Sequence, residues 1–337
     1  MPTFCRHNRF LANCPVCSAD QVEIVSNRRT STAAPRAAQP RARSASTARG
    51  GRGSSALRVR QVAREQDDGF RSELIPGVKA SAAADRLAQE LAFASARLTL
   101  LADDPPDLYG EVAAAQPAPA GSAEREEALW LAFLIAYLGP LEGDDPFAGV
   151  RAARTSWASD ELPALDDVPL GPRTAHDPAR GTATLAAYRA WAERAKTQDA
   201  AFAGEPSWTP ERRFARVYER LALPGLHHDA RFDLLVTLGQ LGVLDTRPDA
   251  LRLGGPDETT VAAKRIFGIA DTLLLERRAT ELAAAAELPL AALDLGLWNW
   301  SRPPRPGTGE RERATLGAVG TEPDADVYAR VAAALGL

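Results

Sequence analysis

The chain has 337 residues and a formal net charge of −4, with 45% apolar and 25% charged residues, as is usual for a globular protein. No run of eighteen apolar residues occurs, so the sequence excludes an ordinary membrane-spanning helix. The three cysteines are too few for a disulfide framework and fit a reducing cytoplasm, where we expect the protein.

All three cysteines lie close together near residue 1, beside a histidine. Cys5, His7, Cys14 and Cys17 have the spacing C-x-H-x6-C-x2-C. Thiolates and imidazole are the ligands of structural zinc, and four of them complete a tetrahedron. A redox pair with free thiols is one alternative and a disulfide is another, although a redox C-x2-C normally follows a strand in a βαβ pattern. The sequence favours a zinc knuckle over residues 1–22.

Residues 23–66 form the next predicted region. Residues 1–64 contain twelve arginines and two carboxylates, a net charge of +10, so the rest of the chain has a net charge of −14. The region is rich in Ala, Ser, Pro, Gly and Arg and has few large apolar side chains, so we expect a disordered linker. A flexible basic arm is typical of proteins that bind a polyanion such as DNA. A linker that only improves solubility is the alternative.

Residues 67–337 have the apolar spacing of three and four residues that predicts helices. The segment 124–140 is apolar on all sides and predicts a buried central helix. Residues 143–180 are rich in proline and predict loops. Further helices are expected at 80–102, 181–201, 210–222, 228–242, 257–267, 271–286 and 322–335. Because no β alternation is visible, the predicted fold class is all-α.

A short hairpin joins two of these predicted helices. The sequence Leu-Pro-Gly-Leu occupies 223–226, and Asp245 lies twenty residues after Gly225. A tight glycine turn before a helix presents backbone N–H groups that can bind a phosphate. The helix that follows can return the chain to the same end of the molecule, which would bring Asp245 near the hairpin.

This pattern resembles the helix-hairpin-helix DNA glycosylase superfamily, in which an L-P-G-[VI]-G hairpin precedes a V-D-T segment with the essential aspartate. Here the segments read LPGL and LDT, and "EALWLAFLIAYLGP" and "AALDLGLWNWSRP" look like an early and a late helix of that domain. The similarity spans roughly residues 125–303. It implies that Asp245 is catalytic. Asp229 stands where bifunctional members have a Schiff-base lysine, so the resemblance implies a monofunctional enzyme.

The N-terminal knuckle followed by a helical domain looks most like the α-glutamyl/putrescinyl thymine pyrophosphorylases. That group is predicted to act on hypermodified pyrimidines and is related to glycosylases that attack modified cytosines in phage DNA. The resemblance implies excision of a hydroxymethyl-derived or hypermodified pyrimidine in phage defence. The nucleotide would flip out of the helix, and ionised Asp245 would stabilise the cationic sugar as the N-glycosidic bond is hydrolysed.

Other candidate site residues have a structural alternative. Asp144 and Asp145 could line the pocket or form a polar turn, and Asp271 could line it or cap a helix. Trp298 could stack on a base or belong to the core, and Asp245 could itself be a cap. The candidate DNA contacts are Gly225, Leu226, His227, His228, Lys264 and Arg265. The histidines could instead cap a helix, and Lys264 and Arg265 could be a solvated face.

A second class of function stays open. The chain could be a non-enzymatic, zinc-containing DNA-binding or adaptor protein on a glycosylase-like scaffold. The net charge of −14 outside residues 1–64 favours this alternative, because glycosylases are usually basic where they face DNA.

Overall fold

The computed structural model describes residues 67–142, 145–159, 161–302 and 325–337, all of which belong to one compact unit, residues 61–337. These ranges contain twelve α-helices, one short 3-10 helix and no strand. The predicted all-α class is therefore confirmed for this part of the chain. The predicted zinc knuckle and the predicted linker lie outside the described residues.

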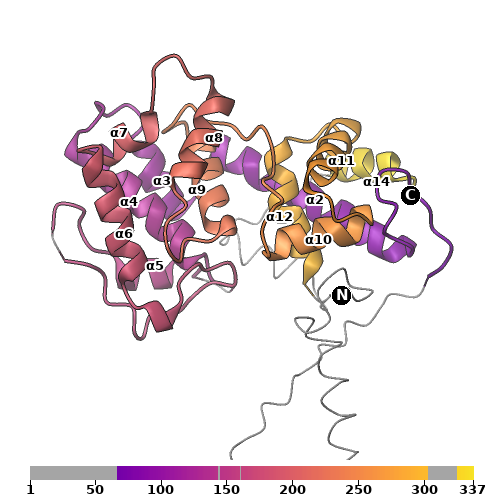
Figure 1. The fold of residues 1–337 in the computed structure, drawn as a ribbon, viewed down its shortest axis with the longest axis horizontal. Coiled ribbons are helices and arrows are strands. Elements are labelled where there is room, and N and C mark those ends of the chain that lie inside the picture. Colours follow the sequence, from indigo (N-terminus) through magenta and orange to yellow (C-terminus); the bar gives the residue numbers. More distant parts are fainter. Residues whose placement is uncertain (1–66, 143–144, 160, 303–324) are drawn as a thin grey trace, which may run out of the picture. The chain divides into compact units, whose positions relative to one another are not determined.

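The helices are joined by connections of unequal length, the long ones including residues 154–177 and 241–257 (Figure 1). In chain order they are α2 (Ser81–Asp103), α3 (Asp107–Ala114), α4 (Ala123–Leu138), α5 (Ala148–Ala153), η2 (Pro178–Arg180), α6 (Ala183–Arg194), α7 (Gln198–Ala203), α8 (Pro210–Arg220), α9 (His228–Gln240), α10 (Glu258–Phe267), α11 (Thr272–Ala285), α12 (Leu290–Ser301) and α14 (Ala325–Leu335).

The helices differ from the sequence prediction in three places, one of which is α5, a helix within residues 143–180 that were predicted to be loops. The predicted helix 181–201 is divided into α6 and α7, because Lys196 has a positive φ of 77° and Thr197 begins a new helix. The Thr197 hydroxyl accepts a hydrogen bond from the Ala200 N–H at 3.0 Å, which is ordinary N-cap geometry. Helix α3 was not predicted at all.

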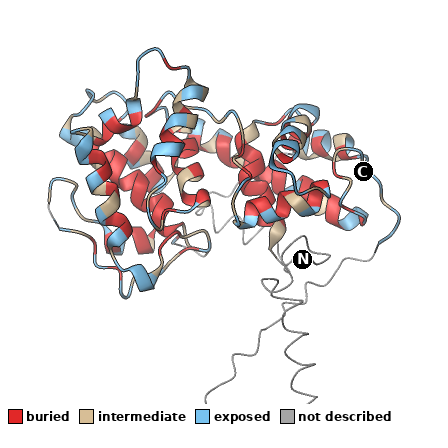
Figure 2. Cartoon of the chain, in the orientation of Figure 1, coloured by how far each residue is buried: buried red, intermediate tan, exposed pale blue. Residues whose placement is uncertain are grey.

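Helix α4 is the buried central helix that its apolar sequence predicts. Every residue from Ala128 to Leu138 is buried (Figure 2). Helices α3, α5, α7 and α9 pack around it. An aromatic stack extends from it to α6, where the rings of Phe133 and Tyr188 lie 3.7 Å apart between centroids. This packing gives α9 a rigid support.

Helix α2 connects α9 with the helices near the other end of the chain. It packs against α12 and α14 and also against α9, while α10, α11 and α12 contact one another. Gly296 permits the close approach of α12, because a Cβ there would lie 2.7 Å from the Leu91 side chain of α2. No described helix is long and apolar enough to cross a membrane. Helices α9 and α12 therefore both pack against α2.

Candidate functional site

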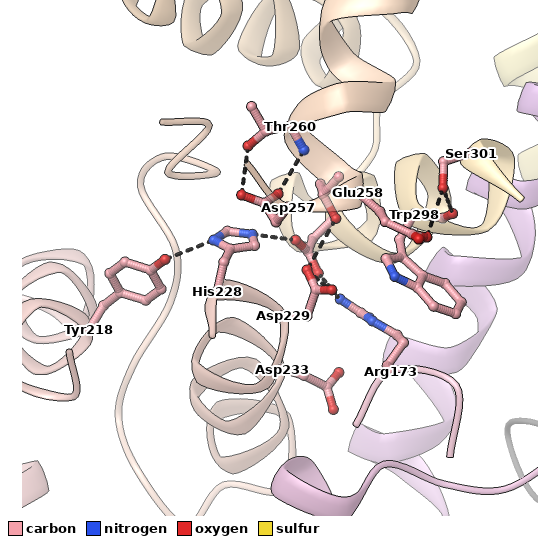
Figure 3. A network of polar contacts seen from close by, with 12 residues as sticks. Arg173, Tyr218, His228, Asp229, Asp233, Asp257, Glu258, Thr260, Trp298 and Ser301 are labelled. Atoms are coloured by element: carbon pink, nitrogen blue, oxygen red, sulfur yellow. Dashed lines mark hydrogen bonds and ion pairs between the residues drawn. The ribbon is translucent and has the colours of Figure 1, made fainter. Parts of the chain in front are cut away.

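Four ionisable side chains from distant parts of the sequence meet at the start of α9 (Figure 3). We call them the α9 cluster: Arg173, His228, Asp229 and Asp294. Asp294 is at its centre, with Oδ1 3.0 Å from His228 Nε2 and Oδ2 2.7 Å from Arg173 Nη2. Asp229 Oδ1 lies 3.9 Å from the same Arg173 nitrogen. The Asp294 side chain is 3% exposed and that of Asp229 19%, so Asp229 is the carboxylate that solvent reaches.

The hairpin at 223–226 fixes the start of α9. The Leu226 N–H donates to the Leu223 carbonyl at 3.1 Å, and Gly225 has a φ of +83°, as expected at the third position of a type II turn. The turn is held against α6, where the Thr184 hydroxyl donates to the Pro224 carbonyl at 2.9 Å. A Cβ at Gly225 would lie 2.3 Å from that hydroxyl oxygen. The tight hairpin is therefore present, and it places His228 and Asp229 in the first turn of α9.

Arg173 enters the cluster from a loop that crosses the end of α4. The Gly171 N–H donates to the Leu138 carbonyl at 3.0 Å, which satisfies one of the last carbonyl groups of that helix. No side chain fits at position 171, because a Cβ would lie 2.2 Å from the Pro140 carbonyl oxygen. The loop therefore presents Arg173 from a fixed position.

His228 has partners for both ring nitrogens. Tyr218 Oη on α8 lies 2.7 Å from Nδ1, while Nε2 faces Asp294. Burial lowers the pKa of His228, but the hydrogen bond and charge of Asp294 outweigh this effect and raise it above its ordinary value. His228 is thus an interior residue. His227 is the exposed one, and it precedes α9 without making a side-chain capping hydrogen bond.

The two carboxyl groups of the cluster are shifted in opposite directions. Burial alone would raise the pKa of Asp294, but Arg173 and His228 hold it below the ordinary value. Burial raises the pKa of Asp229 to about 6, with Arg173 opposing and Asp294 reinforcing the shift. Asp294 consequently stays ionised at neutral pH, while Asp229 can exchange a proton there.

The cluster resembles a metal site in its spacing but not in its charge. One ligand-type atom each of His228, Asp229 and Asp294 lies within 4.8 Å of the others. Arg173 already provides a cation 2.7 Å from Asp294, and its guanidinium cannot be deprotonated at ordinary pH. A metal ion would have to displace or repel that guanidinium. These carboxylates are therefore better suited to pair with the Arg173 guanidinium than to bind a metal ion.

Asp245, which the glycosylase resemblance implies is catalytic, lies elsewhere. Its side chain is 75% exposed, and its Oδ2 accepts from Arg213 Nη1 at 3.0 Å. It follows α9, whereas the cluster lies at the beginning of that helix. It does not cap a helix, because α10 begins only at Glu258, with Asp257 as its cap. The catalytic role of Asp245 stays a prediction that these contacts do not test.

The remaining candidates are dispersed. Asp144 is outside the described residues, and exposed Asp145 forms an ion pair with Arg151. Asp271 is the N-cap of α11, accepting from the Leu274 N–H at 3.0 Å, which was its structural alternative.

The aromatic and basic candidates belong to α10 and α12. Trp298 is buried, with the guanidinium carbon of Arg173 5.2 Å from its ring centroid, so it packs against the cluster. Lys264 is half-buried on α10. Arg265 is exposed, and its guanidinium carbon lies 4.9 Å from the ring centroid of Trp300.

Sequence reasoning did not select Arg173, Tyr218 or Asp294. One of the three had a usable signal, because Asp294 is the only charged residue in the apolar stretch AALDLGLWNW. A carboxylate that a buried helix encloses requires a partner. Nothing in the local sequence shows that Arg173 pairs with Asp294, or that Tyr218 contacts the His228 that also pairs with it.

Comparisons with protein-family models, curated proteins and solved structures find no match. The likeness to the glycosylases therefore rests on the sequence segments quoted above. Any function must be argued from the α9 cluster itself.

Proposed function

We propose that the chain is a monofunctional DNA glycosylase that hydrolyses the N-glycosidic bond of a modified pyrimidine, with Asp229 as its acid–base group. The observation that supports it best is the pair of carboxyl groups, Asp229 and Asp294, whose proton affinities are shifted apart within one cluster. Where the surroundings shift the pKa values of two neighbouring carboxyl groups apart, the group with the raised pKa is a candidate acid–base group.

Asp229 has the features expected of an acid–base group. It is the most exposed carboxylate of the cluster, it exchanges a proton near neutral pH, and it lies in the first turn of α9 directly after the hairpin. The resemblance implies Asp245 as the catalytic aspartate, so the assignment to Asp229 rests on the geometry of the α9 cluster.

The reaction would use one proton and one water. As the bond between C1′ and the base breaks, the Asp229 carboxyl group gives its proton to the leaving pyrimidine. The Asp229 carboxylate then stabilises the cationic sugar and accepts a proton from the water whose hydroxyl adds to C1′. Asp294 remains ionised throughout and holds His228 and Arg173 in place.

DNA affinity is proposed to come mainly from outside the described residues. The ten arginines between Glu23 and Glu65 would contact phosphates regardless of base sequence. Deletion of residues 24–64 is expected to weaken DNA binding and to flatten its dependence on salt between about 50 and about 200 mM. Zinc bound by Cys5, His7, Cys14 and Cys17 would be structural, and native mass spectrometry of wild type and Cys14→Ser tests that proposal.

The direct test is abasic-site formation on DNA duplexes with natural, hydroxymethylated, glycosylated and hypermodified pyrimidines. Asp229→Asn should lower the rate of base release about a hundredfold or more, the effect of losing one group that stabilises the transition state. The matched control is Asp249→Asn, because Asp249 is a surface carboxylate paired with Arg252. That control should retain the wild-type rate.

Asp245→Asn separates the two assignments of the catalytic carboxylate. If Asp229 is the acid–base group, this variant should lose less than about threefold, since the Asp245 carboxylate is solvated and paired with Arg213. A large loss in Asp245→Asn together with near-normal activity in Asp229→Asn would return the catalytic role to Asp245. Absence of base release from every duplex would reject the glycosylase proposal.

A second candidate is a DNA-binding protein without catalysis. Its supporting observation is that Arg173, His228 and Asp294 are each at most 10% exposed and that Asp294 contacts both of the others. In this candidate, the network has a purely structural role and connects α9, α12 and the loop at Arg173. Salt-dependent DNA binding without base release would favour this candidate.

A further inference from the structure

The α9 cluster is electrically neutral only when either His228 or Asp229 carries one additional proton. Two carboxyl groups and one guanidinium leave a single negative charge, and His228 is the only other proton carrier in the cluster. An unpaired charge at this depth is costly. The cluster is neutral when it holds one proton, either on the His228 imidazole, making an imidazolium next to ionised Asp229, or on the Asp229 carboxyl group next to a neutral imidazole.

We infer that His228 and Asp229 share a single proton at neutral pH, and that this shared proton is the one delivered to the leaving base. The inference rests on the proposed function only for the use of the proton, because the sharing follows from the geometry. One polar atom of His228 and one of Asp229 lie within 4.8 Å of each other. Because Tyr218 and Asp294 engage both ring nitrogens, the two groups are coupled by charge across this short separation, so that protonation of one disfavours protonation of the other.

Among the described residues, the surrounding groups supply no further charge that balances Asp229, since the Thr259 hydroxyl, which donates to Asp229 Oδ1 at 3.5 Å, is neutral. Tyr218 on α8 holds His228 Nδ1, and Asp257 at the start of α10 is engaged by the Thr260 N–H at 2.7 Å. One turn along α9, Asp233 is paired with Arg97 of α2 at 3.0 Å. Arg173 Nη2 lies 2.7 Å from Asp294 Oδ2 but 3.9 Å from Asp229 Oδ1, so its main partner is Asp294. The proton of His228 is therefore the one available to balance Asp229.

Sharing matters for the chemistry because it keeps Asp229 supplied with a proton without making the cluster charged. When Asp229 gives its proton to the base, the cluster becomes negative just as the sugar becomes positive. When the water proton returns, the cluster is neutral again, with the proton on either residue. Atoms and charges balance over one turnover with no additional reactant.

The test is an NMR titration of the full chain labelled at the histidine and aspartate side chains. His228→Gln and Asp229→Asn identify the two resonances. In the wild type, the His228 ring and the Asp229 carboxyl carbon should each report the same two apparent midpoints, as expected for strongly coupled groups. In Asp229→Asn, His228 should titrate in a single step, shifted to lower pH by about one unit. The control Asp249→Asn should leave both resonances unchanged.

Two results would overturn the inference. One is a single His228 step in the wild type at a midpoint that Asp229 does not share, a result that needs no variant to fold. The other is a His228 midpoint unchanged by Asp229→Asn. Because the titration is read without substrate, coupled midpoints combined with no base release would retain the shared proton and reject the glycosylase proposal instead.

Discussion

Asp229 and Asp245 lie near opposite ends of α9, Asp229 in its first turn and Asp245 beyond its last. The two carboxylates differ in how far they are buried and in which groups they contact. The Asp245 side chain is 75% exposed and is hydrogen-bonded to Arg213, whereas that of Asp229 is 19% exposed and shares a guanidinium with a second carboxylate. Partial burial beside a like charge raises the pKa of a carboxylate, as it does at Asp229. The position of an aspartate in a motif therefore says less about its chemistry than its neighbours do.

The largest expected effect would come from emptying the centre of the cluster. Asp294→Ala leaves Arg173 and His228 buried without their carboxylate, so we expect a loss of about 3–5 kcal/mol in the free energy of unfolding. The matched change in the other region, Asp245→Ala, should cost no more than about 0.5 kcal/mol. Urea unfolding of both variants measures the difference, and similar losses would show that the two regions are energetically alike.

A smaller effect of opposite sign is expected at Asp229. Since its pKa is raised to about 6, folding penalises its ionised form, and this penalty grows as the pH rises from about 4 to about 6. Replacing it with a neutral isostere removes the penalty. Asp229→Asn should be more stable than wild type by about 1–3 kcal/mol at about pH 8, as is common where a site is kept for function. A less stable variant would contradict this.

The pH dependence of stability sharpens the same comparison. The raised pKa of His228 gives stability that is present below about pH 6.5 and lost as pH rises through its folded value. The lowered pKa of Asp294 gives stability that is present above about pH 4 and lost in acid. Between about pH 5 and about pH 8, the unfolding free energy of wild type should fall more steeply than that of Asp229→Asn. If the free energy of unfolding of the two proteins had the same pH dependence, the α9 cluster would not be its source.

The smallest effect is expected at Asp245. Asp245→Asn should leave the free energy of unfolding within about 0.5 kcal/mol of wild type, because the Asp245 side chain is 75% exposed and an ion pair with a solvated partner contributes little. Differential scanning calorimetry and the titration of His228 are the two measurements. A shift of the His228 midpoint in this variant would mean that Asp245 is electrostatically linked to the cluster.

The sequence predicted much of the fold and part of the site. Helix α9 was predicted as 228–242 and is His228–Gln240, because its apolar spacing and the preceding turn residues are local signals. Helix α3 was missed since its eight residues include Gly110 and are too short for a clear period. The hairpin was found from Pro224 and Gly225 alone.

The cluster could not be predicted, because its partners are set by packing. Arg173 reaches it only through the close approach of Gly171 to the end of α4, and α12 reaches it through the fit of Gly296 against α2. His228 was expected at the surface because the sequence HHD looks like a polar helix start. No local pattern reveals that Tyr218 and Asp294 enclose it.

The distance along the chain between the cluster's members has a consequence for protein synthesis. Arg173 and Asp294 are 121 residues apart, and His228 and Asp294 are 66 apart, so the cluster requires the nearly complete helical region. Contacts of such long range form late in folding. While the polypeptide is still being made on the ribosome, Asp229 would be an ordinary solvated carboxylate and His228 an ordinary imidazole. The shifted pKa values of the cluster would thus be absent from nascent chains and from proteolytic fragments that end before α12.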